Sequence, residues 1–277
     1  MDAEKIMWRD VAALVALGHV DFAGIVHNHF SRQGVETETD AWGMIPKWRP
    51  EFSTPAGMPL WAMEVYYRFL NCGFRLGVSA GSASGVKYSP LGYNRVYVNL
   101  PGRFGYEDWF RALKQGLSFA TNGPMLFLTV EGKGPGGVLQ FPKKPPRRIR
   151  IHAEASSLTP MDRLEVLFKG KAIRTARGAG KLTVDFTTDV GETGWFAARA
   201  FEKPDRAIRF AQTSPVYVEF AGDTGIVRED AKFFLDWTDR EIAFYQKLPG
   251  FREAAHRDAM VALFSAAREV YARLAAR

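Results

Sequence analysis

The chain has 277 residues, of which 47% are hydrophobic and 24% are charged, with a net charge of +7 and a single cysteine. This composition is typical of a globular protein long enough for two domains, and it excludes an internal disulfide and a cysteine-rich zinc module. No run of about 18 apolar residues occurs, and the first ten residues lack the basic start and apolar core of a signal peptide. As printed, the sequence predicts a cytoplasmic protein that makes no membrane contact; an N-terminal extension would reopen the question of export.

Positive charge is concentrated in one run, KKPPRRIR, at residues 143–150. The run mixes basic residues with prolines and contains no aromatic residue, which is typical of an exposed connector rather than of a nucleic-acid platform. We therefore expect a basic, proline-rich linker at 142–147 and no nucleic-acid partner. The linker would separate a first region, 1–141, from a second region, 148–221.

Helical and strand patterns alternate through the first region. Helices are predicted at 10–17, 60–71 and 106–115, and strands at 20–26, 75–81, 94–100 and 117–121. The last helix is expected to bury Trp109, Phe110 and Leu113 on one side. Buried strands that alternate with helices imply a parallel sheet covered by helices, so this region is predicted to have an α/β fold.

The periodicity changes after the linker. Strict alternation at 148–155, a hairpin around Gly170 and further short strands up to residue 221 predict a small antiparallel β-sandwich of immunoglobulin-like type. Residues 222–277 then show two amphipathic helical stripes, which are expected to pack back on the core. Trp195 and Trp237 are interpreted as core residues.

Two segments carry a family resemblance. YYRFLNCGFRLGVSAGSASGVKYSPLGYNRVYVNL, at 66–100, and YEDWFRALKQGLSFATNGPM, at 106–125, resemble CehA/McbA-type members of the PHP (polymerase and histidinol phosphatase) metallohydrolase superfamily. Weaker similarity is found at 17–35, 213–218 and 231–237. The resemblance implies a distorted β/α barrel that holds two or three divalent metals and hydrolyses phosphate or carboxylic-type esters, followed by an accessory sandwich.

The same resemblance implies that the metal site is incomplete. The opening barrel strand of the family carries a His-x-His pair, which would lie upstream of Met1, so only part of the barrel is expected here. The family's late Ser-Asp-x-His is matched by Ser82, with Ala83 and Gly85 where Asp and His would stand. Neither of these side chains can bind a metal. Gln212 stands where many relatives have His.

His27 and His29, in the segment VHNHF, are the remaining metal-ligand candidates. In an extended segment, side chains two residues apart point the same way, and barrel enzymes build their sites where strands end. Zinc, manganese or iron could bind there, but a catalytic zinc needs about three protein ligands, so a chain without metal is equally plausible. The alternative is that both histidines hydrogen-bond the loop. Nearby carboxylates that could complete the site are Glu36, Glu38, Asp40 and Glu64.

Three further residues are candidates for substrate binding. Arg95 could clamp an acidic substrate, and Asn94 and Asn122 stand at a strand entrance and at a turn, although an internal hydrogen-bonding role is about as plausible for each. Cys72 is interpreted as a buried hydrophobe rather than a nucleophile. The glycine-rich GSASG, at 81–85, is interpreted as a tight turn rather than a phosphate cradle.

Two functions therefore remain open. The chain is either a metal-dependent hydrolase with a small-molecule substrate, or a non-catalytic fragment or pseudoenzyme that serves as a binding or oligomeric scaffold. A half barrel leaves open sheet edges, which a second copy of the chain or a missing N-terminal segment would cover.

Overall fold

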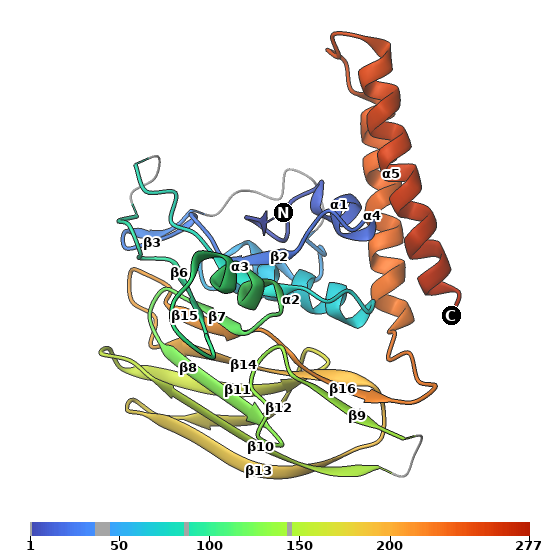
Figure 1. Cartoon of the computed structure of the whole chain (residues 1–277). Coiled ribbons are helices and arrows are strands. Elements are labelled where there is room, and N and C mark those ends of the chain that lie inside the picture. The colour runs from blue at the N-terminus through green and yellow to red at the C-terminus, as the bar shows by residue number, and fades with distance from the viewer. Residues whose placement is uncertain (1, 37–44, 86–88, 143–145) are drawn as a thin grey trace.

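The computed structural model describes residues 2–36, 45–85, 89–142 and 146–277, and it has a mixed α/β architecture. Figure 1 shows stacked β-strands in the lower part, helices and short strands above them, and two long helices standing at one side. Within the described ranges, no helix is both long enough and apolar enough to cross a membrane.

A small parallel sheet lies in the upper part. It contains β1 (Asp2–Ala3), β2 (Phe22–Val26) and β5 (Gly77–Ala80), in the order β1-β2-β5. The helix predicted at 10–17 is confirmed as α1 (Val11–Ala16). Two very short strands, β3 (Phe30–Ser31) and β4 (Gly34–Val35), pair with one another just after β2.

Helix α2 (Met58–Asn71) forms the centre of the upper core. Pro59 lies in its first turn, where the missing N–H of proline costs no hydrogen bond. The helix is buried on most sides, including Tyr66 and Phe69, so tertiary packing stabilises it more than helix propensity does. A short 3₁₀ turn, η1 (Pro50–Ser53), precedes α2 and approaches it so closely that a Cβ at Gly57 would lie 1.8 Å from the Glu51 carbonyl oxygen.

The largest sheet has eight strands and curls into a half-barrel. Its main order is β12-β11-β14-β15-β7-β6, with β16 joined to β14 and β9 joined to β16. The strands are β6 (Arg95–Val98), β7 (Ser118–Thr121), β9 (Val138–Phe141), β11 (Met161–Phe168), β12 (Lys171–Arg177), β14 (Gly194–Glu202), β15 (Phe210–Thr213) and β16 (Val216–Phe220). The sheet is mixed, because only the β16–β9 pair is parallel.

The prediction of a wholly parallel sheet in the first region is therefore wrong for β6 and β7, which run antiparallel. The helix between them, α3 (Tyr106–Lys114), buries only Ala112 and Leu113, and Phe110 is exposed instead of buried. Because α3 covers so little of the sheet, it does not act as a crossover helix. The chain reverses after it at Gly116, which has φ +73°, and returns beside β6.

A second layer lies beneath the large sheet. It is a three-stranded antiparallel sheet of β8 (Met125–Val130), β10 (Arg147–Ser156) and β13 (Leu182–Val190), in the order β13-β10-β8. The alternation read from the sequence is confirmed, because Ile149, Ile151 and Ala153 point into a buried apolar cluster shared by both layers.

Two strands from the first region join these layers. β8 pairs with β10, and β9 pairs with β16, although both precede residue 142. β10 begins at Arg147, the last residue of the predicted linker, and residues 143–145 of that linker lie outside the described ranges. The large sheet thus continues from one region into the other, since β15 of the second region pairs with β7 of the first.

Two buried serines connect the parallel sheet to the large sheet. The Val78 N–H on β5 donates to Ser214 Oγ at 2.9 Å, and Ser118 Oγ, on β7, donates to the Val78 carbonyl at 3.2 Å. The two hydroxyl oxygens are 2.9 Å apart. The hydroxyls hydrogen-bond the N–H and carbonyl groups of Val78, which no described strand pairs on this side. They therefore bridge the gap between the parallel sheet and the large sheet, and the curl of the half-barrel continues across it.

The predicted C-terminal helices are present as α4 (Arg228–Lys247) and α5 (Ala254–Ala275), which pair along their length and rise beyond the body in Figure 1. Phe234 on α4 stacks on Phe69 with ring centroids 4.0 Å apart. The Tyr271 hydroxyl donates to the Ala12 carbonyl at 2.7 Å. Trp237 is buried beside these residues, as predicted, and the helix pair therefore packs on the α1 and α2 side of the molecule.

Candidate functional site

His27 and His29 lie just after β2, where the sequence places the metal-ligand candidates. Both side chains are buried, with 0% and 1% of their surface exposed, and their ring centroids are 5.4 Å apart. The Phe30 ring packs against His27, with the centroids 4.5 Å apart. The structure therefore brings the two imidazoles together at the carboxyl end of a parallel strand.

Lys5 reaches into this histidine pair from the segment that follows β1. Its Nζ lies 2.8 Å from Nε2 of His29, and 3.9 Å from the centre of the Trp8 ring. Only 7% of Lys5 is exposed. An ammonium group can only donate, so Nε2 of His29 accepts this hydrogen bond with the lone pair that a metal would otherwise use.

His27 is held in its neutral form. Burial, followed by the neighbouring His29 and then Lys5, lowers the pKa of His27 well below its usual value. Its Nδ1 accepts a long hydrogen bond, 3.4 Å, from the His29 backbone N–H, which leaves the proton on Nε2. That Nε2 is buried and has no hydrogen-bond partner among the described residues.

Asn94 connects the histidine turn to the glycine-rich turn after β5. Its Nδ2 donates to the carbonyls of His27 at 2.9 Å and Phe30 at 3.0 Å. The Asn94 backbone N–H donates to Ser82 Oγ at 2.8 Å. The side chain of Asn94, a sequence candidate for substrate binding, therefore fastens two turns together.

The two positions expected to have lost metal ligands lie in this glycine-rich turn. Ala83 and Gly85 both have positive φ, +48° and +89°. A tight turn at the end of β5 was the predicted structure of this segment, and an alanine in the left-handed region is uncommon.

Among the described residues, no third ligand is found near the histidines. Glu64 pairs with Arg68 instead, at 2.7 Å, on the outer side of α2. Glu36 follows β4, whereas Glu38 and Asp40 lie outside the described residues. In the described part of the chain, no group of three or more His, Cys, Asp or Glu side chains could hold a metal ion.

Cys72 and Gln212 are both buried in the interior of the protein. Cys72 is buried, as predicted, and burial raises the pKa of its thiol far above the usual value, which disfavours the thiolate form that a nucleophile needs. Gln212 is fully buried, accepts a hydrogen bond from the Tyr67 hydroxyl at 2.6 Å, and donates to the Thr213 carbonyl at 2.9 Å. It fixes α2 to β15.

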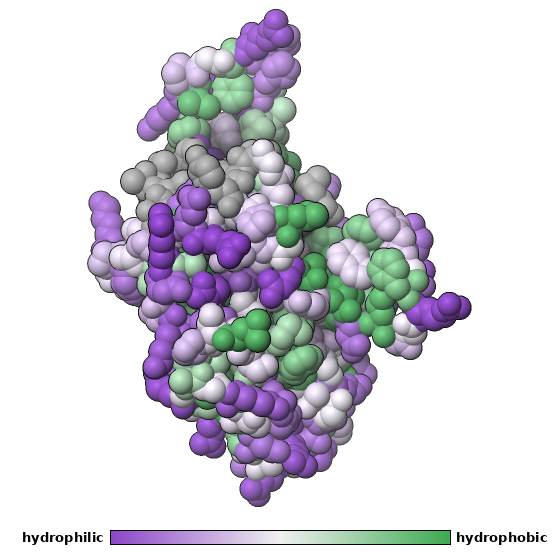
Figure 2. Space-filling model, turned by 90° about the vertical axis from the view of Figure 1, so that its left-hand side faces the viewer, coloured by the Kyte–Doolittle hydropathy of each residue, from purple (hydrophilic) through white to green (hydrophobic). Residues whose placement is uncertain are grey.

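A separate pocket lies where the upper part meets the two strand layers, and we call it the junction pocket. It has a volume of about 570 Å³, and its polar lining includes Arg32, Tyr93, Arg95, Asn122, Glu202 and Arg209. These residues come from the ends of strands far apart in the sequence. Figure 2 faces the left-hand side of the view in Figure 1, and hydrophilic residues gather across the middle of that side.

Arg95, the predicted clamp for an acidic substrate, lines this pocket. Among the described residues, its guanidinium donates only to neutral oxygens: the Tyr97 hydroxyl at 3.1 Å and the carbonyls of Tyr93 at 3.0 Å, Gly123 at 3.3 Å and Gly92 at 3.5 Å. No ion pair joins Arg95 or the exposed Arg32 to a carboxylate in the described ranges.

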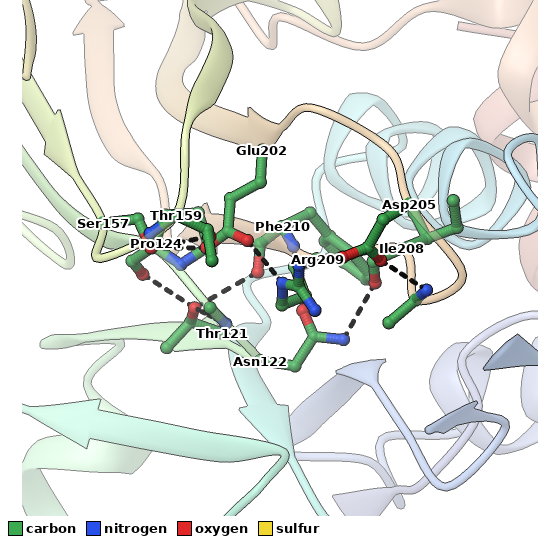
Figure 3. A network of polar contacts seen from close by, with 12 residues as sticks. Thr121, Asn122, Pro124, Ser157, Thr159, Glu202, Asp205, Ile208, Arg209 and Phe210 are labelled. Atoms are coloured by element: carbon green, nitrogen blue, oxygen red, sulfur yellow. Dashed lines mark hydrogen bonds and ion pairs between the residues drawn. The ribbon is translucent and has the colours of Figure 1, made fainter. Parts of the chain in front are cut away.

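Arg209 is paired, in contrast to the other two arginines. Its guanidinium binds the buried carboxylate of Glu202 and also Asp205, the latter at 2.6 Å (Figure 3). The Ser157 hydroxyl donates to the same Glu202 carboxylate. These contacts fix one wall of the pocket and balance the charge of Arg209.

Asn122 also lines the junction pocket, but its amide is already used. Oδ1 accepts from the Phe210 backbone N–H at 2.8 Å, and Nδ2 donates to the Ile208 carbonyl at 3.0 Å (Figure 3). Asn122 thus fixes the chain that enters β15.

Sequence reasoning did not identify several residues of these sites: Lys5, Arg32, Tyr93, Glu202 and Arg209. The spacing of Asp205 and Arg209 was a weak signal for an ion pair. No local pattern marks Lys5, since its contact with His29 spans 24 residues.

Comparisons of the chain with protein-family models, with curated proteins and with solved structures found no match.

Proposed function

We propose that this chain is a non-catalytic relative of the CehA/McbA-type PHP metallohydrolases, in which a partial barrel and sandwich serve as a ligand-binding scaffold. The observation that carries the proposal is the contact between Lys5 Nζ and His29 Nε2, 2.8 Å long. It places a buried cationic side chain where the metal of such a site would be bound.

Electrostatics argue against a metal ion beside this lysine. Two like unit charges 4 Å apart repel by about 4 kcal/mol at a partly buried site, and a divalent ion doubles this value. The histidines supply no negative charge to offset the repulsion, because His27 is neutral and its lowered pKa reflects burial. The donor set in the described residues therefore does not fit a resident divalent metal.

The late strand of the resemblance supports the same proposal. Ala83 and Gly85 offer no ligand atom, and the amide of Asn94 occupies the space between the two turns. The amide nitrogen of Asn94 joins the two turns through their carbonyl groups, which is a structural role, whereas His27 Nε2 and Asn94 Oδ1 have no hydrogen-bond partner among the described residues.

A hydrolase remains the second candidate, and one observation favours it. His27 and His29 are both buried at the carboxyl end of β2, and Nε2 of His27 has no partner among the described residues. A partner chain or an N-terminal segment that brought carboxylates could displace Lys5 and complete a site for zinc, manganese or iron.

Metal retention distinguishes the two functions. The purified protein is dialysed against zinc, manganese or iron and then against metal-free buffer, and its metal content is measured beside that of His29→Ala and Lys5→Met. We expect the natural chain to retain far less than one equivalent and Lys5→Met to retain more. Near-stoichiometric metal in the natural chain, lost in His29→Ala, would support the hydrolase instead.

A further inference from the structure

The junction pocket has an excess of positive charge. Three arginines and one carboxylate, Glu202, are the charged groups of its lining, and Glu202 is already paired with Arg209. Asp205, just outside the lining, also pairs with Arg209, so three arginines and two carboxylates leave a net positive charge here, and neither Arg32 nor Arg95 has an ion-pair partner among the described residues. Low-dielectric walls strengthen the attraction of such a cavity for an anion.

Arg95 is held in position before any ligand arrives. Hydrogen bonds to carbonyls and to one hydroxyl fix the orientation of the guanidinium plane without neutralising it. These bonds involve Nε, Nη1 and Nη2, so Arg95 offers a ligand its positive charge and a remaining Nη2 N–H rather than a free fork of donors, and its prior orientation reduces the entropy lost on binding.

Neutral donors accompany the two arginines. The Tyr93 hydroxyl is buried and has no partner of good hydrogen-bond geometry within the described residues, although the Arg209 guanidinium lies near enough to act on its pKa. Burial raises the pKa of Tyr93, and the nearby Arg209 opposes that rise, so the phenol remains a protonated donor at neutral pH. Thr159 also lines the cavity. An anionic oxygen would satisfy the hydroxyl that the protein leaves unsatisfied.

We propose that the junction pocket binds the phosphate or carboxylate group of a small molecule, with Arg32 and Arg95 as the charged contacts and the Arg209–Glu202 pair as a fixed wall. A volume of about 570 Å³ fits a small metabolite rather than a macromolecule. This inference rests on the proposed binding function, and it needs no metal at His27 and His29.

Anion titrations of the whole chain test the proposal. Thermal unfolding is followed while inorganic phosphate, and separately citrate, is added at constant ionic strength maintained with chloride. A ligand that binds only the folded state raises the unfolding temperature with a saturable dependence on its concentration. We expect saturation for at least one of the two probes, with a dissociation constant at least about tenfold weaker in Arg32→Gln and in Arg95→Gln.

Arg174→Gln is the matched control, because Arg174 is an exposed arginine on β12 outside the pocket. It removes the same unit of charge and is expected to leave the dissociation constant unchanged within about twofold. Arg32 makes no hydrogen bond within the described ranges, so Arg32→Gln tests the pocket even if Arg95→Gln folds poorly.

Two results would overturn the proposal: neither anion stabilises the chain beyond chloride, or Arg174→Gln weakens binding as much as Arg32→Gln. Either result leaves the metal measurement unaffected. Stoichiometric metal in the natural chain would instead reject the proposed function while leaving the result of the anion titration intact.

Discussion

Lys5 and His29 are 24 residues apart in the sequence, yet their side-chain nitrogens are 2.8 Å apart in a buried site. The lysine thereby uses the imidazole lone pair and adds a positive charge beside His27. This contact accounts for the poor fit of a divalent metal, although the spacing of the two histidines alone would favour one. Burial is the main reason why His27 is neutral, and His29 and Lys5 add smaller effects.

Stability should fall in acid because of His27. Its pKa is lowered by burial in the folded state but is about 6.5 in the unfolded chain, so the unfolded state binds one more proton below that pH. The stability that depends on neutral His27 is fully present above about pH 6.5. Below that pH, the free energy of unfolding falls by about 1.4 kcal/mol per pH unit until the lowered pKa of the folded state is reached.

Urea unfolding of the natural chain and of His27→Gln at pH 7.5 and pH 5.5 measures this loss. The difference in free energy of unfolding between the two chains should shrink at pH 5.5, whereas His256→Gln, at an exposed position on α5, should keep the full pH dependence. A His27→Gln chain with the same pH dependence as the natural chain would refute the buried, neutral state.

The serine junction should contribute measurably to stability. Ser214→Ala removes the acceptor of the Val78 N–H and leaves a buried backbone donor unsatisfied, at a cost of about 1–3 kcal/mol. Ser84→Ala, in an exposed turn, should change the free energy of unfolding by less than about 0.5 kcal/mol. Equal denaturation midpoints for the two variants would show that the sheets do not depend on this junction.

Phe234 should be critical for docking the C-terminal helices. It is fully buried and stacks on Phe69 and Tyr271, so Phe234→Ala should cost about 3–5 kcal/mol. Phe104→Ala, at a side chain that is 75% exposed, is the control and should be nearly neutral. Chemical denaturation of both variants checks this, and a loss below about 1 kcal/mol for Phe234→Ala would contradict the packing described.

Asn122 should act on stability rather than on ligand affinity. Both ends of its amide bind backbone groups at 208–210, so Asn122→Ala should destabilise the chain by about 1–3 kcal/mol. The phosphate or citrate affinity of the folded variant should change by less than about twofold, because the backbone groups at 208 and 210 hold both ends of the amide in a structural role and Asn122 carries no charge. Isothermal titration at a temperature where the variant is folded measures the affinity; a tenfold loss without destabilisation would assign Asn122 to substrate binding.

Much of the local structure could be predicted from residue patterns. The alternation of Ile149, Ile151 and Ala153 and the glycine that ends α1 are local signals, and both elements form where they were expected. The strand direction of β7 was not predictable in this way, because it depends on how little surface α3 buries and on pairing with β15, which lies about 90 residues downstream.

The candidate sites were likewise predictable only in part, because local spacing marks some of their residues and tertiary contacts bring in the others. The two imidazoles lie together, but they do so in a turn at 27–30 and not in the extended segment that the spacing argument assumed, and Lys5, which alters their chemistry, carries no sequence signal. Arg95 was identified by its residue type, whereas its companion Arg32 comes from another segment and joins it only in the folded chain. Asn94 and Asn122 lie where polar candidates were expected, and tertiary hydrogen bonds use their amides internally.

The state of His29 Nε2 tests the central claim most directly. Long-range ¹H–¹⁵N correlation spectra of the imidazoles, recorded with and without one equivalent of zinc, report whether that nitrogen accepts a hydrogen bond or binds a metal. We predict an unprotonated Nε2 that is insensitive to zinc in the natural chain and becomes sensitive in Lys5→Met. A stoichiometric zinc-induced shift of His29 Nε2 with Lys5 present would contradict the account.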